Sequence, residues 1–99
     1  MTDMDDDNQI VIPESFIALF VRPGRSKPSE LYATIVQRYE LCEDLACALV
    51  DQATTHKWEL GVETHDIVQR IGQGLAGGGA GISDTEAEWV CKRLTELMD

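Results

Sequence analysis

The stretch SELYATIVQRYELCEDLACALVDQATTH, residues 29–56, repeats an apolar residue every three or four positions over its whole length. This period predicts one amphipathic helix with Ser29 as its N-terminal cap. At 1.5 Å per residue the helix would be on the order of 40 Å long, so we expect it either to bend or to protrude. Leu41, Leu45 and Ala48 lie opposite the main stripe, which predicts that the other helices pack around this one. The main stripe comprises Tyr32, Ile35, Val36, Tyr39, Cys42, Ala46, Leu49, Val50 and Ala53.

Two shorter helices are predicted before and after this long one. In residues 10–20, IVIPESFIALF, Pro13 suits a first helical turn and the apolar residues recur at helical spacing. Residues 21–29, VRPGRSKPS, contain prolines and a glycine, so they are interpreted as an exposed linker.

Gly61 is a fitting helix end, and a third helix begins at about residue 63 or 64. The apolar residues of these two helices are Ile12, Phe16, Ile17 and Phe20, then Ile67, Val68, Ile71 and Leu75, while Trp58, Leu60 and Val62 make the intervening turn too apolar for a free loop.

The last helix has the clearest start signal in the chain. The sequence SDTE, residues 83–86, is a capping box, in which serine and glutamate side chains satisfy amides at a helix N-terminus. The residues after it repeat an apolar side chain at i+3 or i+4 up to Met98. The only alternating pattern, QIVI at residues 9–12, is too short to build a sheet. We therefore expect an all-α fold, a four-helix compact bundle or a more orthogonal packing, with a disordered acidic tail over residues 1–9 and one domain over residues 10–99.

The chain is strongly acidic, with 8 Lys and Arg against 18 Asp and Glu and a net charge of −10. Such a field repels phosphate backbones and anionic head groups, so nucleic acid and membrane are not expected as partners. No apolar run approaches the roughly 18 residues of a spanning helix, and the acidic start MTDMDDDNQ does not resemble a secretory signal. These features predict a cytoplasmic protein.

The stretch IGQGLAGGGAGISDTE, residues 71–86, contains a literal match to the nucleotide-binding pattern G-x-G-x-x-G. That pattern binds a pyrophosphate where a strand leads into the glycine turn and a helix follows it. Here the residues before Gly72 are predicted to be helical, and the phosphate-loop spacing from Gly74 to Gly79 lacks the required lysine and hydroxyl. We therefore expect no nucleotide cofactor, and we interpret the glycines as a helix end in left-handed conformations followed by a flexible connection.

Residues that could hold a metal ion or act as nucleophiles form no recognisable pattern. His56 and His65 flank a turn without a cysteine or carboxylate at a spacing typical of zinc sites. Cys42, Cys47 and Cys91 include no C-x-x-C pair and are expected to be buried reduced thiols, with a reactive or metal-bound thiol as the alternative. No serine or cysteine lies in a known nucleophile motif. The sequence therefore predicts no catalytic residue, no metal site and a protein that is not an enzyme.

Two features are candidates for binding a partner. Arg22, Arg25 and Lys27 lie beside the prolines of the linker and could bind an anionic peptide or phosphate, or fold back on the acidic protein itself. Trp89 lies roughly 160° from the apolar stripe of the last helix. It is predicted to be partly exposed and used at a contact with a partner or a second copy, unless the N-terminal segment covers it.

Glu43 is a candidate for a structural ion pair, because the helical wheel places it on the edge of the stripe that faces the core. Lys and Arg are absent from residues 39–56, and Arg38 points to another side of the helix. We therefore predict that Arg22 or Arg25 folds back and pairs with Glu43, which would tie the first helix to the second. The alternative is that a small helix rotation leaves the carboxylate in solvent.

The strings IPESFIALFVRPGRSKPSE and RYELCEDLA, residues 12–30 and 38–46, resemble a group of short bacterial helical proteins of uncharacterised function. Some of these proteins carry the label "ATPase with chaperone activity". The resemblance covers most of residues 10–97 and implies a stand-alone helical protein. It implies no active site, and the label would suit this chain only as an accessory to an ATP-driven machine.

Together these features predict a non-catalytic adaptor or protein-interaction domain. Its expected partner is another protein, and the chain itself is expected to be a monomer or a weak homodimer. The alternative is an ATP-linked chaperone accessory, or an enzyme whose site is assembled from residues far apart in the sequence.

Overall fold

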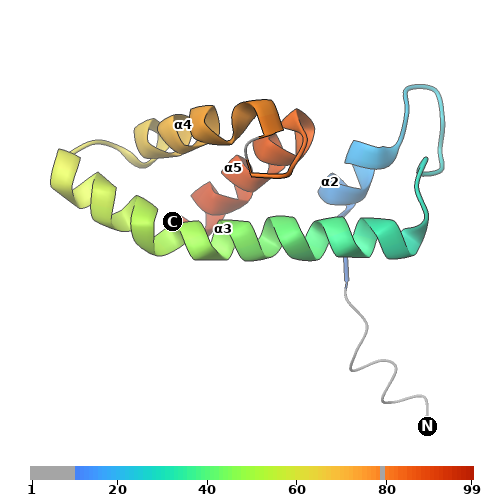
Figure 1. Cartoon of the computed structure of the whole chain (residues 1–99), viewed down its shortest axis with the longest axis horizontal. Helices are drawn as coiled ribbons and strands as arrows, with labels where there is room; N and C mark the ends of the chain where they lie inside the picture. The colour runs from blue at the N-terminus through green and yellow to red at the C-terminus, as the bar shows by residue number, and fades with distance from the viewer. Residues whose placement is uncertain (1–10, 79) are drawn as a thin grey trace, which may run out of the picture.

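The computed structural model of the chain describes residues 11–78 and 80–99 (Figure 1). The predicted acidic tail, residues 1–9, lies outside the described residues. Within the described ranges the chain forms helices and no strand, which confirms the expected all-α bundle. The elements are α2 (Glu14–Ile17), the 3-10 turn η1 (Ala18–Phe20), α3 (Tyr32–Leu60), α4 (Thr64–Leu75), the 3-10 turn η2 (Ala76–Gly78) and α5 (Asp84–Met98).

The helix α3 is continuous over 29 residues and runs along the whole molecule in Figure 1. At 1.5 Å per residue it is about 44 Å long. It extends past His56, the predicted end, as far as Leu60, and stops at Gly61, whose φ of +66° is left-handed. The Gly61 amide donates to the carbonyl oxygen of Lys57 at 2.9 Å, which satisfies a terminal acceptor of the helix.

Ser29 does not cap α3, so that prediction is wrong. Its amide and its hydroxyl both donate to the carbonyl oxygen of Phe20, at 2.6 and 3.0 Å. Ser29 therefore closes the loop that links η1 to α3, and Leu31 occupies the N-cap position without a side-chain hydrogen bond.

The central element of the bundle is α5, and the prediction that the other helices pack around the long helix is wrong. α5 packs against α3, α4 and α2, and it lies between α3 and α4 in Figure 1. On α3 the arc opposite the main stripe is too poor in large apolar residues to bury a second face. Leu41 is 40% exposed and Ala48 is exposed, whereas Leu45 is half-buried.

The buried side chains form two adjoining clusters. The first lies under α2 and the N-terminal half of α3, and it contains Ile12, Phe16, Ile35, Cys42, Ala46, Leu75, Ile82, Ala87, Trp89 and Val90. The second joins α3, α4 and α5 farther along, and it contains Ala53, Ile67, Val68 and Leu94. Of the apolar residues predicted for a helix over residues 10–20, Ile12 and Phe16 are buried. The helix α2 begins only at Glu14, so Ile12 precedes it.

The N-terminus of α5 has the predicted capping box. The Ser83 hydroxyl accepts from the Glu86 amide at 3.2 Å, and the Glu86 carboxylate accepts from the Ser83 amide at 2.8 Å. Arg38 of α3 adds two hydrogen bonds to the same carboxylate, at 2.9 and 2.6 Å. The Arg38 guanidinium holds the pKa of the Glu86 carboxyl below its ordinary value, since it stabilises the ionised form. This partly buried contact ties α5 to α3.

The glycine-rich stretch behaves as a helix end and a connection. Gly72 and Gly74 lie inside α4, so a helix stands where the nucleotide fingerprint needs a strand. Gly77 and Gly81 have φ values of +85° and +78°, which confirms the predicted left-handed conformations. A β-carbon on Gly72 would meet the Cys91 sulfur at 2.9 Å, so this glycine permits the close approach of α4 and α5.

None of the helices in residues 11–78 and 80–99 combines the length and the apolar content that crossing a membrane requires.

Candidate protein-binding site

Trp89 is buried, with 7% of its surface exposed, so the prediction that it is exposed is wrong. Its indole nitrogen donates to the Ser15 hydroxyl of α2 at 3.0 Å. The ring also meets Phe16 and Tyr39 edge-on, with centroids 5.0 and 5.8 Å away. The alternative reading of the sequence therefore applies, because the N-terminal segment covers the side of α5 that a helical wheel leaves free.

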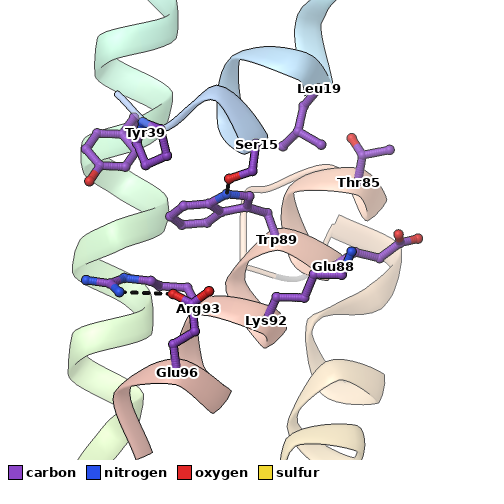
Figure 2. A pocket seen from close by; sticks show the side chains of 10 residues that line it. Ser15, Leu19, Tyr39, Thr85, Glu88, Trp89, Lys92, Arg93 and Glu96 are labelled. Carbon is purple, nitrogen blue, oxygen red and sulfur yellow. Dashed lines mark hydrogen bonds and ion pairs between the residues drawn. The ribbon is translucent and has the colours of Figure 1, made fainter. Parts of the chain in front are cut away.

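A pocket of about 390 Å³ lies beside the Trp89 ring, between α2, α3 and α5 (Figure 2). Two of the hydrogen-bonding side chains that line this pocket are already engaged, whereas Glu88 and Lys92, which also line it, are exposed. Ser15 accepts from Trp89, and Arg93 binds carboxylates on α3 and α5. These groups hold α2 and α3 on α5, so the pocket belongs to the packing of the N-terminal segment.

Glu43 forms the predicted ion pair but with a different partner. Arg93 of α5 donates from two nitrogens to the two carboxylate oxygens, at 2.9 Å each, and it also donates to Glu96 at 3.1 Å. These hydrogen bonds raise the pKa of Arg93. The predicted ion pair between Glu43 and Arg22 or Arg25 is wrong. The prediction rests on cations close to Glu43 in the sequence, whereas α5 places Arg93, 50 residues away, next to the carboxylate.

The cationic linker is fully exposed. Arg22, Arg25 and Lys27 lie in the loop between η1 and α3, where the Arg25 amide donates to the Arg22 carbonyl oxygen at 3.0 Å. Among the described residues none of the three makes an ion pair. Their role as partner-binding residues stays a prediction.

The exposed tryptophan of this chain is Trp58, in the last turn of α3. It is 82% exposed. Next to Trp58 the surface forms an open hollow of about 450 Å³, where the end of α3 meets the turn into α4 and the end of α5. We call this surface the Trp58 tip, and it comprises Thr54, Lys57, Trp58, Gly61, Val62 and Met98.

The backbone under the Trp58 tip is held by a compact set of contacts. The amides of Gly61 and Val62 both donate to the Lys57 carbonyl oxygen, at 2.9 and 3.4 Å. The Lys57 ammonium donates to the Thr64 hydroxyl at 2.8 Å and so joins α3 to α4. Val62 and Met98 pack against the second core cluster and form the apolar floor of the hollow. The tip is therefore an ordered surface and not a free loop.

Sequence reasoning treated Trp58 as part of a turn because it ended the helix near His56. The sequence spacing could have placed Trp58 on the exposed face of the helix. Two helical turns separate Asp51 from Trp58, so a helix continued to Gly61 puts both on the same polar face. Both residues are exposed in the structure.

The three thiols differ in environment. Burial raises the pKa of Cys42 to about 12, and it also raises the pKa of Cys91, so both stay protonated at neutral pH. Cys47 is exposed, which corrects the expectation that all three are buried. The residues that the structure describes contain no group of histidine, cysteine and carboxylate side chains able to hold a metal ion.

No family model, no curated protein and no solved structure matches this chain.

Proposed function

We propose that this chain is a non-catalytic protein-interaction domain that binds another protein through the Trp58 tip. The observation that carries the proposal is the 82% exposure of Trp58 on an ordered base. Tryptophan is the residue type most enriched among those that dominate the energy of protein interfaces, because its large ring gains much from desolvation. A partner that covers Trp58 would recover this gain.

The surroundings of Trp58 distinguish it from a stray apolar residue, which would need no explanation. Val62 and Met98 line the hollow beside the ring. Contiguous apolar surface with a recess marks interaction sites. Met98 suits such a role, since its flexible thioether adapts to the shape of a partner.

The net charge of −10 supports the rest of the proposal. It disfavours nucleic acid and membrane surfaces as partners and opposes tight self-association. We propose that the chain acts in the cytoplasm, as a monomer or a weak homodimer.

Affinity capture from a native lysate tests this function. The full chain is compared with Trp58→Ala and with Leu31→Ala, a matched control that removes another exposed apolar side chain, 77% exposed, from the opposite end of α3. We expect a specific partner with the unaltered chain and with Leu31→Ala, and its loss with Trp58→Ala. Equal capture by all three proteins, or no partner in repeated captures, contradicts the proposal.

The ATP-linked alternative is tested by thermal unfolding with and without ATP and Mg²⁺. A ligand at about 100 times its dissociation constant adds roughly 2.7 kcal/mol of stability. We expect no change in the melting temperature, and a clear increase would favour the alternative.

A further inference from the structure

Resting on the proposed function, we infer that the partner presents to the Trp58 tip an apolar side chain flanked by lysine or arginine. The first observation is a regularity in the sequence around the hollow. Three of its lining residues, Trp58, Val62 and Met98, are each followed directly by an exposed carboxylate. These carboxylates are Glu59, Glu63 and Asp99.

The carboxylates around the tip are available to a partner. Within the described residues none of Glu59, Glu63 and Asp99 has an ion-pair partner. The cation that lines the hollow is Lys57, whose ammonium donates to Thr64 on α4. Three exposed carboxylates therefore stand directly next in the chain to residues of the tip, against one cation, Lys57, in its lining. The charge near the tip is net negative, and Trp58, Val62 and Met98 make its lining largely apolar.

The centre of the tip suits the same kind of partner. The hollow of about 450 Å³ accepts a side chain of the size of leucine or phenylalanine against Val62 and Met98. The exposed face of Trp58 adds an electrostatic attraction, since an ammonium or guanidinium stacks favourably over an indole. An apolar anchor with basic neighbours thus matches both the ring and the exposed carboxylates that follow the lining residues in the chain.

Charge argues against a second copy of this chain as the occupant. A second tip would bring the same carboxylates into contact, and each copy carries a net charge of −10. Like charges placed across an interface oppose association. Anionic partners are disfavoured for the same reason.

Two designed peptides test the inference directly. One carries two leucines flanked by four lysines, and the other has glutamate in place of every lysine. Binding of each dye-labelled peptide to the full chain is followed by fluorescence anisotropy near physiological salt. We expect the lysine peptide to bind at least about tenfold more tightly than the glutamate peptide, since several exposed charge pairs act together. Equal affinities would overturn the inference.

Matched variants separate the tip from the general acidity of the chain. Glu59→Gln with Glu63→Gln removes two charges at the tip, and Glu40→Gln with Asp44→Asn removes two exposed charges elsewhere on α3. Asp44 lies about 21 Å along the helix from Trp58, beyond the screening length of about 8 Å. We expect the tip variant to weaken the lysine peptide by about threefold or more and the control variant to leave it unchanged. Equal losses in the two variants would overturn the inference.

The outcome also separates this inference from the proposed function. If Trp58→Ala abolishes capture of a cellular partner but the lysine peptide shows no preference, the inference fails and the function stands. If Trp58→Ala changes neither the capture of a cellular partner nor the binding of the lysine peptide, the proposed function and this inference both fail. Sedimentation of the chain alone covers the remaining occupant, because a Trp58-dependent dimer would show that a second copy fills the tip.

Discussion

The two tryptophans of this chain occupy opposite environments at two ends of the same bundle. Trp89 is 7% exposed and is enclosed by α2, α3 and α5, with its nitrogen bonded to Ser15. Trp58 is 82% exposed at the end of α3, beside an open hollow. Both lie on helices that turn apolar stripes toward the core. The difference arises from a third element, because α2 covers the outer side of α5 whereas the described residues place nothing over the Trp58 tip.

The face of a helix on which a residue lies therefore does not by itself decide whether that residue is buried. Trp89 points away from the stripe of α5 and is nevertheless part of the core. The two ends should therefore differ in energy as they do in exposure.

The largest effect is expected at Trp89. Trp89→Ala removes the ring that Phe16 and Tyr39 contact and leaves a cavity, so the free energy of unfolding should fall by about 3–5 kcal/mol. Urea denaturation followed by circular dichroism measures this change. Trp58→Ala serves as the control, and equal losses for the two variants would contradict the difference between the ends.

A smaller effect is expected at Glu86, which fastens the start of α5. Glu86→Gln weakens the contact with Arg38, 32% of whose side chain is exposed, and should cost about 2–3 kcal/mol in the free energy of unfolding. The same urea titrations measure it, with exposed Glu88→Gln as the control. Glutamine at this position still completes the capping box, so a loss no larger than that of the control would mean that the ion pair with Arg38 contributes little.

Glu86 also predicts a dependence of stability on pH. Its pKa in the folded protein lies below the ordinary value of 4.5, so its contribution is complete above that pH and is lost as the pH falls through the folded pKa. Melting temperatures between neutral and acidic pH should therefore decline more steeply below pH 4.5 for the unaltered chain than for Glu86→Gln. Parallel curves would contradict this assignment.

The Glu43–Arg93 pair should contribute less, because both side chains are partly exposed, at 22% and 33%. Glu43→Gln is expected to cost about 1–2 kcal/mol in urea unfolding, as a hydrogen bond to a charged group does. Substituting Arg22 and Arg25 with glutamine should change stability by at most about 0.5 kcal/mol, as exposed residues do. A larger loss of stability from the Arg22 and Arg25 substitutions than from Glu43→Gln would contradict the pairing of Glu43 with Arg93.

The smallest effect on stability is expected at the Trp58 tip. Trp58→Ala should change the free energy of unfolding by at most about 0.5 kcal/mol, since the ring makes few contacts that folding creates. Acrylamide quenching checks the exposure that this expectation needs. Trp89→Phe, which keeps Trp58 as the remaining indole, should be quenched strongly, and Trp58→Phe weakly. A protected indole at position 58 would show that the chain itself covers the tip.

The parts of the fold that were predictable from the sequence depend on local contacts. The SDTE capping box predicts the start of α5 from local contacts alone, because Ser83 and Glu86 satisfy each other's amides within one turn. Gly61 likewise ends α3 through its own left-handed conformation. The predicted N-cap at Ser29 is a local prediction that failed, since the Ser29 hydroxyl donates to the carbonyl oxygen of Phe20 in the preceding 3-10 turn.

The candidate site was not predictable in the same way, since it depends on which helices meet. The partner of Glu43 is 50 residues away, on a helix whose placement the sequence does not state. The burial of Trp89 depends on where a short N-terminal helix docks. For Trp58, an error of a few residues in the predicted end of α3 moved it from a helix face into a turn.

Site-specific photo-crosslinking tests the central claim, that the exposed tryptophan position is the surface that a partner covers. A photoreactive phenylalanine analogue is placed at position 58 of the full chain, and in separate proteins at positions 31 and 41, whose leucines are 77% and 40% exposed. After irradiation in cells, we predict a discrete cross-linked partner from position 58 and none from the other two. The same yield from all three positions, or none from position 58, would contradict the claim.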